Sequence, residues 1–253
     1  MKIALISDIH GNLQALQAVI QDIDRNAIQS IICLGDIISM GLQPGEVITM
    51  LQSIHCSFIL GNHDEPFIDF SQMGMLSVIS EEVFISNKWT LGHISEPQRE
   101  FIRTFKSSVK LQDARGRKIY CFHGTPKHNY EGISPDTDDD SIHVYLDECN
   151  DDIFVCGHTH RQMRREFNGK IIINPGSVGS VFNESCSKGN GTALQPWAEY
   201  GILDLSKNNV SFEMEKIPFN ISQLQSVIDN TDHPYKEWWK NQYFAHRESG
   251  AVT

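Results

Sequence analysis

The sequence predicts an α/β protein in which two β-sheets form a sandwich flanked by helices. Apolar, β-branched runs recur along the chain, and most of them end in Gly or Asp, as buried strands do. In the N-terminal part these runs alternate with helical patterns in the order βαβαβ, which is typical of a parallel sheet covered by helices. The C-terminal half is richer in strands, and a second sheet accommodates them.

The strands divide into two kinds. Six apolar runs are predicted as buried strands, at residues 2–8, 30–36, 56–62, 118–124, 152–158 and 170–175. Two later runs, 199–205 and 209–217, alternate apolar and polar residues more regularly, which is typical of antiparallel strands with one solvated face. Asn208 and Asn209 supply turn residues for a hairpin between them.

Helical patterns fall between the strands. The first begins after Asn12, the predicted N-cap, and places apolar residues at the helical period as far as Ile23. Further helices are predicted at residues 44–51, 97–105, 141–149 and 221–228. The acidic run 136–140 precedes one of them, and we interpret it as a negatively charged helix start rather than a ligand cluster.

Length and composition indicate one globular domain over residues 1–253, with a helical C-terminal extension at about 218–253. The chain is 40% hydrophobic and 21% charged, which excludes disordered and fibrous classes. No apolar run reaches the roughly 20 residues of a membrane span. The net charge of −11 makes nucleic acid an unfavourable partner, because phosphate binding needs Lys and Arg.

The six cysteines form no C-x-x-C pair, and four of them lie inside apolar runs, where free cysteine behaves as a small hydrophobe. The N-terminus lacks the length and cleavage site of a signal peptide. Together these features predict a reduced, cytoplasmic protein.

Polar clusters occupy the places where the apolar runs stop. They are Asp8-Ile9-His10, Gly35-Asp36, Gly61-Asn62-His63-Asp64, His123-Gly124, Gly157-His158-Thr159-His160 and Asn174-Pro175-Gly176-Ser177. Each cluster alone is a weak signal, since turns use the same residues. Ligands bind beyond the carboxyl ends of strands in open α/β sheets, so the whole set is expected to converge. Carboxylate, amide and imidazole without thiolate suit Mn²⁺, Fe, Zn²⁺ or Ni²⁺.

The order of these motifs resembles the calcineurin-like metallophosphoesterase superfamily over residues 2 to about 205. Residues 7–16 and 174–178 are similar to its small bacterial phosphodiesterase-type branch. The resemblance implies a four-layer αββα sandwich of two mixed sheets flanked by helices, and a centre with two divalent metal ions, manganese being favoured. It also implies the ligands, which are Asp8, His10 and His160 for metal 1, Asn62, His123 and His158 for metal 2, and Asp36 as the bridge.

The implied activity is hydrolysis of a small phosphodiester or phosphomonoester, nucleotides included, by a metal-bridging hydroxide that attacks phosphorus in line. The resemblance assigns His63 to the leaving group and Asp64 to orienting His63. As an imidazolium, His63 can stabilise the developing charge or protonate the leaving alkoxide. Asn12 caps a helix that begins beside Asp8, so we expect this helix end to favour the anionic substrate.

Two departures from the family pattern bear on the substrate. Asp36 is followed by Ile-Ile-Ser-Met-Gly and lacks the Asp-Arg-Gly of the protein-phosphatase branch. Many relatives carry Pro-Arg after the turn at 174–178, whereas this chain continues Gly-Ser-Val-Phe-Asn-Glu. Arg161 is the nearest replacement for a phosphate-clamping arginine, and a solvated arginine is the competing interpretation. The Asn-, Gly- and Ser-rich residues 183–197 are predicted as a flexible loop that forms a substrate lid.

Alternatives to a small-molecule phosphoesterase stay open. One is a phosphoprotein phosphatase or a nuclease, although the acidic charge disfavours the nuclease. Another is a non-catalytic scaffold of the same fold that binds partners; such proteins have lost ligand histidines, whereas every ligand position is filled here. The aromatic cluster at 235–244 either covers the core or forms a contact in a homo-oligomer. The remaining histidines, expected at the surface or in turns, are His55, His93, His128, His143, His233 and His246.

Overall fold

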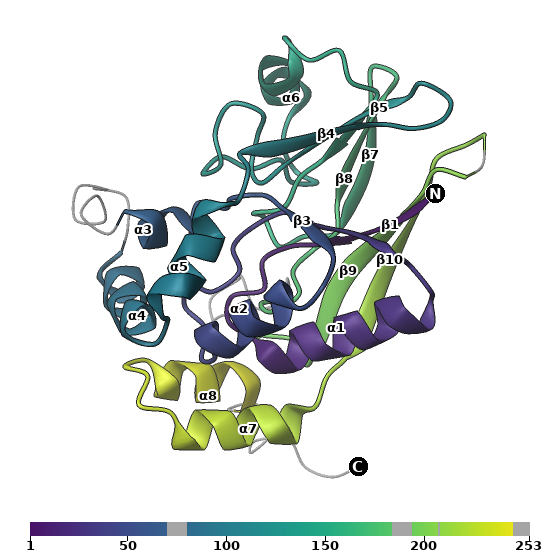
Figure 1. Ribbon diagram of the computed structural model, residues 1–253. Helices are drawn as coiled ribbons and strands as arrows, with labels where there is room; N and C mark the ends of the chain where they lie inside the picture. Colours follow the sequence, from purple (N-terminus) through teal and green to yellow (C-terminus); the bar gives the residue numbers. More distant parts are fainter. Residues whose placement is uncertain (70–79, 184–193, 207, 245–253) are drawn as a thin grey trace, which may run out of the picture.

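Two five-stranded sheets lie between two layers of helices in the computed structural model, which describes residues 1–69, 80–183, 194–206 and 208–244 (Figure 1). The first sheet has the order β10-β9-β1-β2-β3 and the second the order β4-β5-β6-β8-β7. Both are mixed, because each combines parallel strand pairs with antiparallel ones. The predicted sandwich of two mixed sheets flanked by helices is therefore confirmed.

The strands of the first sheet are β1 (Lys2–Ile6), β2 (Ser30–Cys33), β3 (Cys56–Phe58), β9 (Trp197–Asp204) and β10 (Ser211–Pro218). Those of the second are β4 (Ser108–Gln112), β5 (Lys118–Phe122), β6 (Ile153–Val155), β7 (Met163–Phe167) and β8 (Lys170–Asn174). Parallel registers such as Ile3↔Ser30 and Ile119↔Ile153 bring the carboxyl ends of neighbouring strands to a common edge of each sheet.

The helices are α1 (Leu13–Arg25), α2 (Pro44–Gln52), α3 (Glu65–Ile68), α4 (Glu81–Gly92), α5 (Glu96–Arg103), α6 (Asp139–Leu146), α7 (Ile221–Asn230) and α8 (Lys236–Phe244). Asn12 caps α1, as expected, by accepting a hydrogen bond from the Ala15 N–H at 3.1 Å. At α6 the side chain of Asp138 accepts from the Ser141 N–H, so the acidic run is a helix start, as predicted. No helix within the described ranges is long and apolar enough to cross a membrane.

The apolar run Ile3–Ile6 of β1 is explained by the two cores that it faces. Ala4 and Ile6 pack toward the helices α1, α2, α7 and α8, whereas Ile3 and Leu5 pack between the two sheets. Alternate residues of a strand point to opposite faces, so a strand in the middle of four layers must be apolar throughout. A third core lies between the second sheet and α6. The layer order is thus helices, sheet, sheet, helix.

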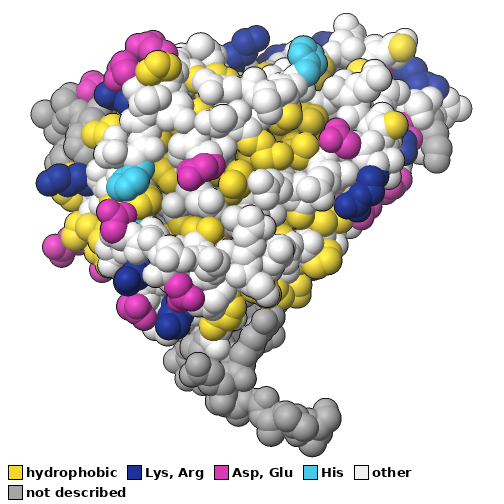
Figure 2. Space-filling model, turned by 60° about the horizontal axis from the view of Figure 1, so that its bottom comes forward, with side chains coloured by type: hydrophobic (Ala, Val, Ile, Leu, Met, Phe, Trp, Pro, Cys, Tyr) yellow, Lys and Arg dark blue, Asp and Glu magenta, His cyan; other side chains and the backbone are white. Residues whose placement is uncertain are grey.

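The C-terminal helices cover the first core. Trp239 and Tyr243 of α8 are 2% and 7% exposed, so much of the aromatic cluster packs inward. Where α7 and α8 come forward, in the view of Figure 2, acidic and basic side chains are interspersed with apolar ones. On this face, the net negative charge is therefore not gathered into one acidic area.

Candidate metal centre

Five candidate ligands adopt the left-handed backbone conformation that non-glycine residues avoid. Their φ angles are 54° at Asp8, 44° at His10, 56° at Asp36, 66° at His158 and 57° at His160. Within the described ranges, three other non-glycine residues do so. Each such residue costs roughly 1–3 kcal/mol and persists where the surrounding structure holds it. Backbone strain is therefore concentrated in the loops that follow the strands.

The loops after β1 and β2 hold each other in place. The Asp8 N–H donates to the Gly35 carbonyl and the His10 N–H donates to the Asp36 carbonyl, both at 3.0 Å. The loop after β3 approaches so closely that a Cβ on Gly61 would lie 2.1 Å from Asp36 Oδ1. The glycine beside Asn62 is therefore required by the close contact of two chains.

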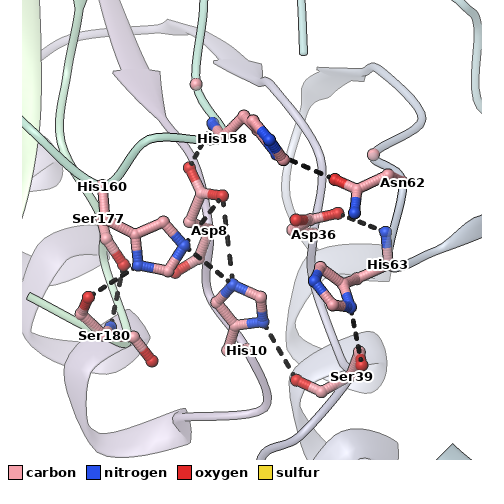
Figure 3. A network of polar contacts seen from close by, with 12 residues as sticks. Asp8, His10, Asp36, Ser39, Asn62, His63, His158, His160, Ser177 and Ser180 are labelled. Carbon is pink, nitrogen blue, oxygen red and sulfur yellow. Dashed lines mark hydrogen bonds and ion pairs between the residues drawn. The ribbon is translucent and has the colours of Figure 1, made fainter. Parts of the chain in front are cut away.

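The first group of ligand-capable side chains contains Asp8, His10 and His160 (Figure 3). His160 Nε2 lies 3.1 Å from His10 Nε2 and 3.3 Å from Asp8 Oδ1. Asp8 is fully buried, and its Oδ1 has no hydrogen-bond partner among the described residues. The Nε2 atoms of His10 and His160 and one Asp8 carboxylate oxygen thus face one another, and no single hydrogen-bond donor among them can satisfy all three.

The second group contains Asp36, His123 and His158, with Asn62 between the two rings. His123 Nε2 lies 3.2 Å from Asp36 Oδ2 and 3.0 Å from Asn62 Oδ1. His158 Nδ1 lies 3.0 Å from the same amide oxygen. The two groups adjoin, because the backbone N–H of His158 donates to Asp8 Oδ2 at 3.1 Å.

Backbone carbonyls fix which ring nitrogen is free in three of the four histidines. The Nδ1 contacts are His10 to Ser39 at 3.0 Å, His123 to Leu34 at 2.8 Å and His160 to Ser180 at 2.7 Å. A carbonyl only accepts, so Nδ1 carries a proton and Nε2 is the nitrogen that faces the other ligand-capable groups. Metal-binding histidines are oriented in this way. His158 presents Nδ1 instead.

The buried charges shift pKa values in opposite directions. Burial disfavours the ionised form of Asp8, but the imidazole of His160 outweighs it and lowers the pKa of Asp8 to about 2. Burial also disfavours the imidazolium of His123, whereas Asp36 and Asp8 raise its pKa to about 9. For His10, burial and the charge of His160 lower the pKa to about 4. Ionised carboxylates and shared protons fit a site where cations replace protons.

His63 is held by contacts that differ from those predicted. Asp64 was expected to orient His63, but its carboxylate accepts from the backbone N–H groups of Asp36, Ile37 and Gly61 at 2.8–3.1 Å. The prediction for Asp64 is therefore wrong: a buried carboxylate beside three N–H groups binds them, and it fixes the loops rather than the ring.

Ser39 makes the contact that had been assigned to Asp64. Its hydroxyl lies 3.3 Å from His63 Nδ1 and donates to Asn87 Oδ1 at 2.6 Å (Figure 3). Since that proton is used, the hydroxyl accepts from Nδ1, and His63 keeps Nε2 for other partners. Sequence reasoning missed Ser39 and Asn87, because neither lies in a motif.

The two predicted substrate-binding residues are placed differently. The Asn12 side chain is 2% exposed, and its amide donates to the Gly179 carbonyl while its oxygen caps α1. Both polar atoms are used within the fold, so the Asn12 side chain itself has a structural role, and the expectation that this helix end favours the anionic substrate stays a prediction. Arg161 forms an ion pair with Asp136 and lines a pocket beside His160.

Two pockets adjoin the centre. One, of about 330 Å³, is lined by His160 of the first group. The other, of about 320 Å³, is lined by His123 of the second group together with Thr125 and Tyr130. The predicted lid at 183–197 borders the first pocket at both ends, and its residues 184–193, like His246, lie outside the described part of the chain.

Comparison with known proteins identifies the fold and the family. The chain is 28% identical to the uncharacterized protein MJ0912 of Methanocaldococcus jannaschii, over 97% of this chain and 98% of that protein. The hypothetical protein PH1004 of Pyrococcus horikoshii OT3 has a similar structure, with a TM-score of 0.78 at 18% identity, over 96% of this chain and 97% of that one.

A metallophosphoesterase of Sphaerobacter thermophilus has the same fold, with a TM-score of 0.67 at 24% identity, over 90% of this chain and 93% of that one. Residues 1–192 match the calcineurin-like phosphoesterase superfamily domain. The match spans the loops that carry both ligand-capable groups. The chain therefore belongs to the calcineurin-like phosphoesterase superfamily.

Proposed function

We propose that this metal-dependent phosphoesterase is a phosphodiesterase with two divalent metal ions, acting on small esters that include nucleotides. The observation that carries the proposal is the pair of adjoining ligand-capable groups, each with two imidazoles and a carboxylate. In this proposal Asp8, His10 and His160 hold one ion, and the group of His123 and His158 holds the other.

The remaining two ligands of the second ion are proposed to be Asn62 and Asp36, with Asp36 as the bridge. Asn62 Oδ1 lies 3.0 Å from a nitrogen of each ring of that group, which supports it as a ligand. Bound divalent ions supply positive charge that clamps phosphate oxygens and lowers the pKa of a water. Manganese is the favoured metal from the family resemblance, and the oxygen and nitrogen donor set suits Mn²⁺, Fe, Zn²⁺ and Ni²⁺ alike.

His63 is the proposed proton donor to the leaving group. Its ring centroid lies 5.5 Å from that of His10, so it borders the first ligand group without belonging to it. Ser39 occupies Nδ1, which leaves Nε2 to carry the proton that the leaving alkoxide needs. The Asp36 carboxylate accepts a hydrogen bond from the backbone N–H of His63 at 2.8 Å. Asp36 therefore belongs to the second ligand group and also holds the backbone of the proposed proton donor in place.

A phosphodiester carries two organic substituents on its phosphate, whereas a monoester carries one. Two pockets of similar volume adjoin the centre, one for each substituent of a diester. They share no lining residue, and each is bordered by a histidine of a different ligand group. This arrangement supports a diester as the preferred substrate.

The test is hydrolysis of bis-p-nitrophenyl phosphate and of p-nitrophenyl phosphate by chelator-treated protein reloaded with Mn²⁺, Fe²⁺, Zn²⁺ or Ni²⁺. We expect metal-dependent turnover with the higher kcat/KM for the diester, and about two metal ions per chain by elemental analysis. Turnover of the monoester alone would remove the diester preference. A lack of turnover with every metal would favour the non-catalytic scaffold.

A further inference from the structure

The pocket beside His160 carries aromatic side chains that the proposed chemistry does not use. Phe182 is 42% exposed, and its ring stacks on the His160 ring with centroids 5.1 Å apart and planes 17° apart. Trp197, at the start of β9, lines the same pocket. Two aromatic side chains thus line this pocket, and one of them stacks on a candidate metal ligand.

Polar groups accompany the aromatic ones. Lys216 lies with its Nζ 5.5 Å from the Trp197 ring centroid and 3.1 Å from Glu199 Oε1. Trp197 donates its indole N–H to the same carboxylate oxygen at 3.4 Å. The β9–β10 register fixes this group, since Lys216 pairs with Glu199 across the two strands. Gln195 adds a side-chain amide to the lining.

Size and composition select the ligand class. A volume of about 330 Å³ lies at the small end of the roughly 300–1,000 Å³ of small-molecule sites. Aromatic side chains bind nucleobases by stacking, and amide, carboxylate and ammonium groups can pair with the heteroatoms of a base.

We propose that this pocket binds the base of a nucleotide ester whose phosphate lies at the metal centre. The inference rests on the proposed function, because it assigns one arm of the diester to this pocket. Phe182 and Trp197 provide the stacking surfaces. Lys216, beside Trp197, lies with the base, and Arg161, which follows His160 in the chain, lies with the sugar–phosphate portion of the ligand.

The experiment compares two diesters with the same p-nitrophenolate leaving group, thymidine 5′-(p-nitrophenyl phosphate) and methyl p-nitrophenyl phosphate. For the metal-loaded protein we expect a kcat/KM at least about tenfold higher for the thymidine ester, because only it carries a base. Trp197→Ala and Phe182→Ala should each lower this ratio about fivefold or more, toward 1, because one stacking contact is lost. Trp197→Phe should retain most of it.

The ratio is the readout because a loss of metal or of folded protein lowers kcat/KM for both substrates by the same factor. Phe84→Ala removes an exposed aromatic ring of α4 outside both pockets, and should leave the ratio unchanged. Binding of thymidine 5′-monophosphate, measured by calorimetry with and without metal, should weaken in Trp197→Ala and Phe182→Ala.

The outcomes separate the two proposals. Equal kcat/KM for both diesters, with nucleotide binding unaffected by Trp197→Ala and Phe182→Ala, would overturn the base-binding pocket and leave the phosphodiesterase standing. If Tyr130→Ala, rather than Trp197→Ala or Phe182→Ala, lowered the kcat/KM ratio toward 1, the base would lie in the pocket beside His123, and the base-binding role of the pocket beside His160 would be overturned. Nucleotide binding that depends on Trp197, without turnover of either diester, would support the pocket and refute the proposed activity.

Discussion

Among the described residues, buried histidines lie in two regions, the candidate metal centre and the packing of α4 against the C-terminal helices, and their hydrogen bonds differ. In the candidate metal centre, the Nδ1 atoms of three histidines face backbone carbonyls, which leaves the Nε2 atoms facing carboxylates and each other. Between α4 and the C-terminal helices, His233 accepts the Tyr235 N–H at its Nδ1, and its Nε2 lies 3.0 Å from the Ser86 hydroxyl. There, no ring nitrogen is left for a metal.

The second region has a structural explanation. Trp89 of α4 donates to Asp232 at 2.8 Å and packs edge-on against the His233 ring, so these contacts hold the C-terminal segment against α4. His233 had been expected at the surface or in a turn, but it is 2% exposed. The comparison teaches that burial of a histidine does not indicate a metal site, whereas a ring nitrogen that faces a carboxylate and other ligand-capable side chains does.

Asp36→Asn should have the largest effect. We expect kcat to fall at least about 10³-fold, equivalent to about 4 kcal/mol of transition-state stabilisation, because an amide cannot serve as a charged bridge. Steady-state assays of the diester with metal analysis give the measurement. Asp232→Asn is the matched control, since it removes the carboxylate of the structural group, and its activity should stay near wild type. Near-normal activity of Asp36→Asn would contradict the two-metal centre.

His63→Ala should come next, with kcat lower by about 10²-fold and nearly unchanged metal content, as expected for a lost proton donor. The loss should be smaller for a substrate with a leaving group that needs no proton, such as p-nitrophenolate, than for an alkyl leaving group. Loss of metal in His63→Ala would mean that His63 is a ligand, and the boundary between ligands and proton donor would have to be redrawn.

Much of the candidate centre could be predicted from the sequence, because its residues follow strands whose carboxyl ends lie at the same edge of a sheet. Parallel strands such as β1 and β2 bring Asp8 and Asp36 to one edge, and both were placed there from the apolar runs before them. The fold class followed from the same runs. What the motif could not show was Asp64, since the three backbone N–H groups that it binds depend on loop geometry and not on side-chain identity.

Elements without an apolar pattern were missed. The helix α4 buries the polar residues Ser86, Asn87 and Thr90, so no apolar stripe marks it. Strands β4 and β7 lie at the edges of the second sheet, and Arg164 and Glu166 alternate with less exposed residues in β7. Such elements are determined by the surface that they cover, which a local sequence pattern does not contain.

Metal binding should compete with protons in the centre. Asp36 and Asp8 outweigh burial and raise the pKa of His123 to about 9, so its imidazole is protonated at neutral pH without metal. A metal ion needs the neutral ring, so apparent affinity should rise about tenfold per pH unit for each displaced proton between about pH 6 and 8. Calorimetry in buffers of different ionisation enthalpy counts these protons, and an affinity independent of pH would contradict the prediction.

The smallest expected effect concerns the structural group. Burial lowers the pKa of His233 from 6.5 to about 4, so the unfolded chain binds a proton that the folded protein refuses. The contribution of His233 to stability is therefore complete above about pH 6.5 and is lost as the pH falls toward 4. Its size is at most about 3 kcal/mol, since one pKa unit corresponds to about 1.4 kcal/mol.

Denaturant unfolding of metal-loaded wild type and His233→Gln between pH 7 and pH 4 isolates this term, because the other groups titrate in both proteins. The wild type should lose stability relative to the variant as the pH falls, while His55→Gln, at an exposed position, should follow the wild type. Parallel curves for wild type and His233→Gln would show that His233 takes up its proton while folded. The Nδ1 contact with the Tyr235 N–H would then have to break, and the distinction between a satisfied structural histidine and a metal ligand would lose its physical basis.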